Sequence, residues 1–282
     1  MIWLGLSIIL SSLIFVIFKL FEKFEVALFQ AIVVNYAVAA SLGFLLADSF
    51  SFMEIFKKPW FLAACLVGSL FISLFFLMGK VAQQNGISVS SVATKMSVVI
   101  PVLFAFIVFN DTISTFKVVG ILTALLAIYM VSKKQASATN QPGSLIWPLV
   151  LFIGSGILDT LLKYSQEKLI PENELELFTP TAFSAAFVFG SIALLVTKKA
   201  PKLKSITWGI VLGVPNYFSI LVLLYALSYN GIESSVIFPI NNMGIVLVSA
   251  LVSFIWFKEH FSRQNWIGIA VAILSISFIA FS

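Results

Sequence analysis

Residues Ile87 to Phe109, with the sequence ISVSSVATKMSVVIPVLFAFIVF, form an apolar stretch that is long enough to cross a lipid bilayer as a helix. The stretch nevertheless contains Lys95 and Pro101. A charge at this depth costs several kcal/mol unless it faces a bundle interior or a water-filled cavity. Pro101 removes one backbone hydrogen bond and tends to kink the helix within two turns of the charge. The stretch therefore predicts a spanning helix with a binding site that moves.

The rest of the chain has a similar composition. Hydrophobic residues make up 60% of the 282 positions and charged residues 10%, and the mean hydropathy is +1.08. These values lie far outside the range of soluble domains, and the apolar runs lack the two-residue alternation of barrel strands. We therefore predict an all-α integral membrane protein. The net charge of +5 suits an anionic lipid surface, and no basic face suggests nucleic acid as a partner.

Apolar segments recur between short polar connectors, and we predict that ten of them are transmembrane helices. They are Ile2–Phe18, Val26–Ala47, Pro59–Gly79, Ile87–Phe109, Thr115–Val131, Ser144–Leu162, Thr179–Thr197, Ile206–Tyr229, Ile232–Phe257 and Asn265–Phe281. The six tryptophans fall at predicted ends, where an aromatic belt would place them. The N-terminus lacks a basic region and a cleavage site, so the first segment is expected to be a retained helix and not a signal peptide.

The two halves of the chain repeat each other weakly but in order. At an offset of 144 residues, Trp3 and Lys19 align with Trp147 and Lys163. Residues 1–132 and 144–282 are therefore predicted to be five-helix repeats joined by a polar linker at 133–143. Because each repeat has an odd number of spans, the second must be inverted in the membrane. Inverted repeats are typical of secondary transporters, whose substrate site lies near the midplane.

Corresponding stretches of the two repeats resemble a known family. They are Ser91–Pro101 (SVATKMSVVIP), followed by Asp111 and Gly120, and Phe238–Asn242 (FPINN), followed by Glu259 and Gly268. This layout resembles the EamA-like ten-helix members of the drug/metabolite transporter superfamily. The resemblance implies a transporter with both termini in the cytoplasm, where we expect the bacterial inner membrane as the location. The distribution of lysines among the connectors predicts the opposite orientation, which therefore stays open.

Lys95 is the first candidate for a functional residue. Its ammonium either forms an ion pair with a carboxylate such as Asp159, binds carbonyls exposed near Pro101, or faces a central cavity and attracts an anionic substrate group. Asp159 has two interpretations as well. It either pairs with Lys163, which lies on the same helix face, or it is desolvated and carries a coupling proton or balances the charge of Lys95.

Other polar side chains within predicted spans either join helices to one another or line a cavity. The candidate substrate-binding residues are Ser12, Asn35, Tyr36, Ser91, Thr94, Lys95, Asn216, Tyr217, Asn241 and Asn242, and the candidate hinges are Pro101, Pro215 and Pro239. The small-residue pair Gly209 and Gly213 permits close helix approach, either within the monomer or in a homodimer.

The sequence favours a transporter over an enzyme. It contains one histidine, His260, and no nucleophile elbow, P-loop or dinucleotide motif, so no cofactor and no metal site are expected. We predict a secondary active exporter or exchanger for a small polar metabolite, anionic or zwitterionic, such as an amino acid. A multidrug exporter of lipophilic compounds and a channel are the alternatives. Lys95 argues against lipophilic cations, and the ordered repeat with prolines at matching depths argues against a channel.

Overall fold

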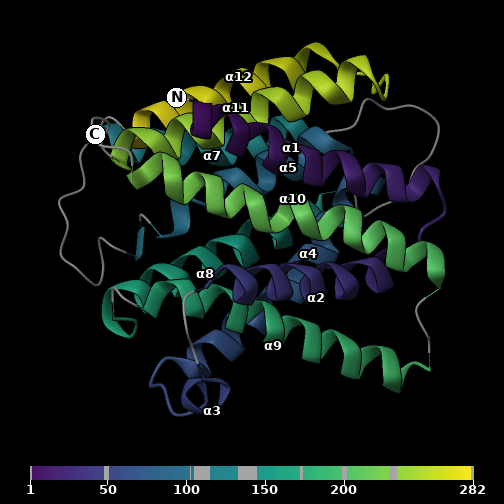
Figure 1. Cartoon of the computed structure of the whole chain (residues 1–282). Coiled ribbons are helices and arrows are strands. Elements are labelled where there is room, and N and C mark those ends of the chain that lie inside the picture. Colours follow the sequence, from purple (N-terminus) through teal and green to yellow (C-terminus); the bar gives the residue numbers. More distant parts are fainter. Residues whose placement is uncertain are drawn as a thin grey trace. The chain divides into compact units, whose positions relative to one another are not determined.

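The computed structural model describes residues 2–47, 51–101, 103–104, 115–132, 145–171, 174–198, 202–228 and 234–280, and its regular structure in these residues is helical (Figure 1). The helices are α1 (Ile2–Lys23), α2 (Leu28–Leu46), α3 (Phe52–Ile55), α4 (Phe61–Gln84), α5 (Ile87–Met96), α7 (Thr115–Ser132), α8 (Ile146–Lys168), α9 (Leu175–Val196), α10 (Leu203–Ser228), α11 (Ser234–Ile255) and α12 (Arg263–Ala280). Asp111 and the predicted linker at 133–143 lie outside the described residues.

Within the described residues, six segments are long and apolar enough to cross a membrane. They are Ile2–Lys23, Leu28–Leu46, Phe61–Gln84, Ile146–Gln166, Glu176–Val196 and Leu203–Leu223. Shorter apolar helices cover Ile87–Pro101, Val118–Val131 and Ile240–Ile255. The prediction of an α-helical, multi-pass membrane protein is confirmed at this level.

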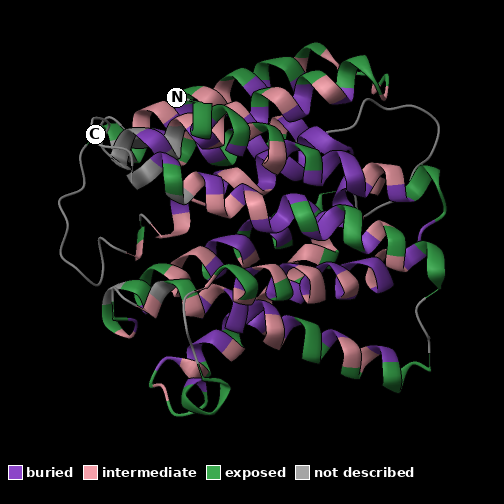
Figure 2. Ribbon diagram, viewed as in Figure 1, coloured by how far each residue is buried: buried purple, intermediate pink, exposed green. Residues whose placement is uncertain are grey.

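The chain forms two compact units. Unit 1 comprises Met1–Leu20, Leu77–Gly156 and Phe218–Ser282, and unit 2 comprises Phe21–Phe76 and Ile157–Tyr217. Each unit contains segments from both predicted repeats, because α4, α8 and α10 are divided between the units. Along the helices, buried and exposed residues alternate (Figure 2). Many exposed side chains are large and apolar, as a surface in contact with lipid requires.

In unit 2, α2 packs against α9 through two glycines. A Cβ atom at Gly43 would lie 2.7 Å from the Cβ of Pro180, and a Cβ atom at Gly190 would lie 2.6 Å from a methyl carbon of Val33. The late part of α2 thus meets the early part of α9, and the early part of α2 meets the late part of α9. The two helices are therefore antiparallel. Both pairs, Gly43 with Gly190 and Val33 with Pro180, are 147 residues apart.

The small-residue pair of α10 contacts α2 within the same unit. A Cβ atom at Gly213 would lie 2.7 Å from the Cβ of Val38 and 2.9 Å from the carbonyl oxygen of Asn35. Gly209, one turn earlier, approaches Val34 in the same way, with 2.5 Å between the two Cβ positions. The stripe that the sequence predicts as a helix-packing surface therefore packs within the monomer.

The contact between α4 and α9 repeats the contact between α10 and α2. A Cβ atom at Gly68 would lie 2.5 Å from the carbonyl oxygen of Ala182 and 2.7 Å from the Cβ of Ala185. Around Gly213 the neighbours are again a carbonyl oxygen and the Cβ three residues later. Ala182 and Ala185 follow their counterparts Asn35 and Val38 by 147 residues. Two glycines at corresponding places thus fit against corresponding atoms.

These contacts predict the effect of filling a helix interface. Gly213→Ala should lower the unfolding temperature in detergent, because an overpacked core contact costs about 1–3 kcal/mol. Gly68→Ala should cost a similar amount, since its surroundings are equivalent. Gly5→Ala is the matched control, because no atom lies within 4 Å of its added Cβ. Equal unfolding temperatures for Gly213→Ala and Gly5→Ala would contradict the close approach.

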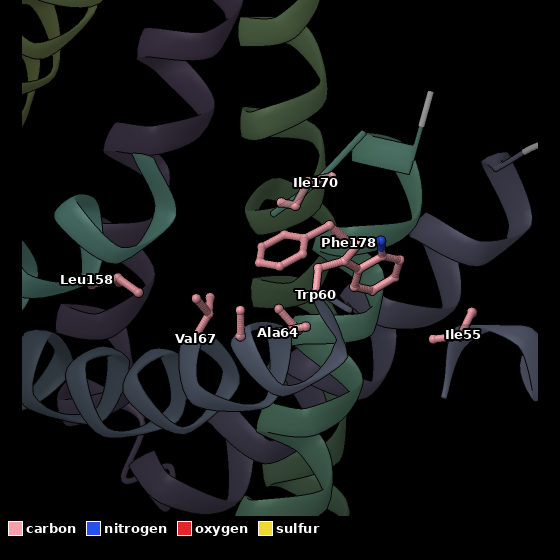
Figure 3. Close-up of a cluster of buried hydrophobic side chains, with 9 residues drawn as sticks. Ile55, Trp60, Ala64, Val67, Leu158, Ile170 and Phe178 are labelled. Atoms are coloured by element: carbon pink, nitrogen blue, oxygen red, sulfur yellow. The ribbon is translucent and has the colours of Figure 1, made fainter. Parts of the chain in front are cut away.

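A cluster of buried apolar side chains lies where α3 and α4 meet α8 and α9 in unit 2. In Figure 3 the rings of Trp60 and Phe178 lie together, with Ala64 and Val67 along α4. The Trp60 ring is fully buried, and its Nε1–H donates to Oε2 of Glu174 at 2.5 Å. The other carboxylate oxygen of Glu174 accepts from Nζ of Lys58 at 2.6 Å. The carboxylate therefore ties the segment before α4 to the start of α9.

The Glu174 contacts predict a stability that depends on pH. Hydrogen bonds from Lys58 and then from Trp60 lower the pKa of Glu174, and the same pair raises the pKa of Lys58. A lowered carboxyl pKa stabilises the fold above the unfolded value of about 4.3, and this contribution is lost as the pH falls through the folded pKa. A raised lysine pKa stabilises below the unfolded value of about 10.4 and is lost as the pH rises through the folded pKa.

We expect Glu174→Ala to lower the unfolding temperature at neutral pH, because it leaves the buried indole N–H of Trp60 unpaired at about 1–3 kcal/mol. The difference from the unmodified protein should shrink as the pH falls into the range where Glu174 is protonated. Glu176→Gln, at an exposed position in the first turn of α9, is the control and should change little. A destabilisation by Glu174→Ala that is independent of acid pH would contradict the ionised contact.

In unit 1, α7 packs against α12 in an antiparallel arrangement. Oγ of Ser275 donates to the carbonyl oxygen of Gly120 at 2.7 Å, and the amide of Asn265 donates to the carbonyl oxygens of Met130 and Val131 at 3.1 and 2.9 Å. The last four carbonyls of a helix lack partners within the helix, so Asn265 caps the end of α7. Helix α5 packs against α7, α11 and α12 in the same unit.

Candidate functional site

The most polar of the apolar helices is α5, which carries the stretch that contains Lys95. Its serines at positions 88, 90 and 91 are at most 2% exposed. Oγ of Ser91 donates to the carbonyl oxygen of Ser88 at 3.1 Å, and Oγ1 of Thr94 donates to that of Ser90 at 2.8 Å. Oγ of Ser90 donates across to the carbonyl oxygen of Met78 on α4 at 2.9 Å. Most of these hydroxyls therefore bind backbone, which leaves Ser88 as the exception.

Lys95 lies half-buried in the last turn of α5. The regular helix ends at Met96, earlier than the predicted segment, although a short helical stretch follows after a turn at Ser97. Pro101 has no N–H to donate to the carbonyl of Ser97, which instead accepts from the N–H of Ile100 at 2.9 Å. The ammonium therefore sits next to a helix C-terminus, whose partial negative charge favours a cation.

The N-terminus of α5 is held by Glu259, which follows α11. Oε1 of Glu259 accepts from the backbone N–H of Ile87 at 3.4 Å, and Oε2 accepts from Oγ of Ser253. Gly86, the residue before α5, has a φ of 107°, and a Cβ atom there would lie 2.6 Å from Oε2 of Glu259. A carboxylate at a helix N-terminus is favourable. The acidic residue of the second family-like stretch thus positions the helix that bears Lys95.

Several buried polar atoms have no hydrogen-bond partner among the described residues. In unit 1 they are Oγ of Ser12, Ser88 and Ser249 and Oδ1 of Asn241, and in unit 2 the Nδ2 of Asn35. Ser12, Asn35 and Asn241 are predicted site residues. Most buried polar atoms in folded proteins are paired, so groups of this kind mark places where water or a ligand is expected.

In unit 2 the structure brings two predicted residues together. Nδ2 of Asn216 donates to Oδ1 of Asn35 at 3.2 Å, and both side chains are buried. The hydroxyl of Tyr36 donates to the carbonyl oxygen of Phe71 at 2.9 Å, so this group binds backbone. Tyr217 is buried beside α2, where one of its ring carbons lies 3.3 Å from the Cβ position of Gly43.

The remaining predicted residues have different surroundings. Asp159 is half-buried and Lys163 is exposed on α8, and Asn242 is half-buried on α11. Pro215 lies inside α10, directly before Asn216. Pro239 falls within α11, but its side chain lies outside the described residues.

Ser249 is the buried polar residue that sequence reasoning missed. It follows Asn242 by seven residues, so both lie on one face of α11, and this spacing is the signal that could have identified it. No three histidine, cysteine or carboxylate side chains gather in the part of the chain that the structure describes. The polar groups there suit hydrogen bonding and charge attraction.

Comparison with known proteins places the chain among proteins of similar length. No family model matches it. It is 29% identical over 283 residues to a protein of Haemophilus influenzae strain Rd that is described as uncharacterized, covering 96% of this chain and 94% of that protein. A crystal structure named only as that of a protein is similar with a TM-score of 0.63 and 13% identity, covering 98% of this chain and 94% of the other. This similarity shows the fold alone.

Proposed function

We propose that this protein is a secondary active transporter, an exporter or exchanger, of a small anionic or zwitterionic metabolite such as an amino acid. It would belong to the EamA-like transporters of the drug/metabolite superfamily and work in the bacterial inner membrane. Residues 1–132 and 144–282 would form two inverted five-helix repeats that alternate access to one site. The six apolar segments that are long enough to span a membrane support the setting of this proposal.

The observation that carries the proposal is the exchange of contacts within unit 2. Gly43 meets Pro180 while Gly190 meets Val33, and the surroundings of Gly68 match those of Gly213. An exchange of this kind, in which each element offers its partner the same surface, is what a two-fold axis generates. The constant separation of 147 residues between corresponding atoms in α2 and α9 supports a repeat of the two chain halves.

The polar features of α5 support an anionic or zwitterionic substrate. A lysine next to a helix break in an apolar segment is expected only where a function requires it. Hydroxyls without partners occur on α1, α5 and α11, and hydroxyls can donate to substrate oxygens. Lipophilic cations would be repelled by the same ammonium.

Uptake into liposomes that contain the purified protein tests the function. The solute panel consists of radiolabelled L-alanine, acetate, inorganic phosphate and tetraphenylphosphonium. We expect uptake of a zwitterion or an anion that saturates with solute concentration, because a carrier has a finite number of sites. Saturable uptake of tetraphenylphosphonium alone would overturn the proposal in favour of a drug exporter, and uptake that never saturates would indicate a channel.

A further inference from the structure

The serines with unpartnered hydroxyls come from three helices of unit 1. Ser12 on α1 is 2% exposed, Ser88 on α5 is 2% exposed, and Ser249 on α11 is fully buried. Oγ of each has no hydrogen-bond partner among the described residues. A buried hydroxyl that is left unpaired costs about 1–3 kcal/mol. Three such groups therefore need an explanation if they lie close together.

The register of α1 and α11 places two of the hydroxyls at one level. Leu4 and Ile237 belong to one buried cluster, and Ile8 contacts Gly244, where an added Cβ would lie 2.4 Å from the Ile8 side chain. The two helices therefore run in the same direction. One turn beyond Ile8 is Ser12, which lies level with the region just after Gly244 that includes Ser249.

The register of α5 and α11 adds the third hydroxyl. Glu259 binds both the N–H of Ile87 and Oγ of Ser253, so α5 begins beside the end of α11. Because the two helices pack together, they are antiparallel. Ser249 is one turn inward from Ser253, and Ser88 is at the start of α5. The levels of Ser88 and Ser249 differ by about one helical turn, roughly 5 Å.

We propose that the hydroxyls of Ser12, Ser88 and Ser249 form a hydrated site that binds an oxyanion, such as the carboxylate or phosphate group of the transported molecule. Hydroxyl hydrogens complement oxyanion oxygens, and water satisfies them when the ligand is absent. Lys95 lies further along α5 and adds positive charge to the same unit. Asn241 is eight residues from Ser249, about 12 Å along α11, which is too far to bind the same group. The identity of the oxyanion as substrate rests on the proposed function, but the existence of the site does not.

Cysteine labelling tests the site without knowledge of the substrate. In a Cys65→Ala background, Ser12→Cys, Ser88→Cys and Ser249→Cys are made in the full chain and placed in lipid nanodiscs. The probes are anionic sulfonatoethyl methanethiosulfonate and its cationic trimethylammonioethyl analogue. The control is Ser275→Cys, because Ser275 is fully buried and its hydroxyl is already bound to Gly120.

We expect the anionic probe to modify the three site cysteines at least about tenfold faster than the control cysteine, because a positive potential raises the local anion concentration. The preference over the cationic probe is measured relative to a small free thiol. Acetate or phosphate, at matched ionic strength with chloride as the reference, should slow the labelling. Protection by acetate alone identifies a carboxylate site, and protection by phosphate alone identifies a phosphate site.

Labelling no faster than at Ser275→Cys, or no protection by either anion, would overturn the site. If a cysteine variant fails to fold, Ser249→Ala and Ser275→Ala provide a second measurement. Ser249→Ala should lose the rise in unfolding temperature that acetate or phosphate gives the unmodified protein, while Ser275→Ala keeps it. Equal rises in both variants would also reject the site. Labelling and protection without solute uptake would retain the site and reject transport, whereas uptake without labelling would reject the site alone.

Discussion

Replacing Lys95 with methionine should reduce uptake of an anionic or zwitterionic solute by about tenfold to a hundredfold without loss of folded protein. A hydrogen bond to a charged group contributes about 1.5–3 kcal/mol, and each 1.4 kcal/mol is a factor of ten in affinity. The methionine keeps most of the side-chain volume, so the packing of α5 should survive. The measurement is the initial rate of solute uptake into liposomes, normalised to the amount of monodisperse protein.

The matched control for this variant is Lys80→Met. Lys80 also lies on an apolar helix, but its ammonium is 3.7 Å from the ring centroid of Trp147 in unit 1, which gives it a local structural partner. We expect Lys80→Met to transport normally, with at most a small loss of stability. Lys95→Arg should keep part of the activity, since the charge remains. Normal uptake by Lys95→Met would remove Lys95 from the proposed site.

Gly86→Ala should strongly destabilise the protein and impair its activity. The backbone at Gly86 has φ 107° and ψ 159°, a region that side chains other than glycine rarely adopt and that costs about 1–3 kcal/mol to impose. The new Cβ would also lie 2.6 Å from Oε2 of Glu259. Either α5 or the segment after α11 must then shift. The measurements are the unfolding temperature in detergent and the rate of solute uptake.

A double-mutant cycle separates the two causes of this effect. Glu259→Ala removes the contact with the added Cβ, but it also removes the partner of Ile87 and Ser253. We expect Gly86→Ala to cost less in the Glu259→Ala background than alone, with the backbone strain remaining. An unchanged cost in both backgrounds would mean that the carboxylate does not hold the start of α5. A neutral Gly86→Ala would contradict the described conformation.

The helical segments could be predicted from hydropathy because a lipid-exposed backbone has few alternatives to a helix. The predicted segment Val26–Ala47 agrees closely with α2 (Leu28–Leu46). The agreement is poorer in α5, where the regular helix ends at Met96. Proline predicts a disturbance there, but the place of the break depends on which backbone groups find other partners.

The partners of polar side chains could not be predicted from the sequence. Ser88 and Ser91 lie on one stripe of α5, yet only Ser91 donates to its own helix backbone in the structure. The bond between Trp60 and Glu174 joins residues 114 positions apart, and no local pattern indicates it. Such pairings follow from how distant helices pack. The sequence therefore identified polar candidates but not which of them remain available to a ligand.

Entrance counterflow tests the central claim of a carrier most directly. Liposomes containing the protein are loaded with a high concentration of an unlabelled solute that the uptake panel identifies, and a trace of the labelled solute is added outside. A carrier with one alternating site predicts a transient accumulation of label above its equilibrium level, because internal solute returns sites loaded or competes for exit. A steady approach to equilibrium with no such overshoot would contradict the account.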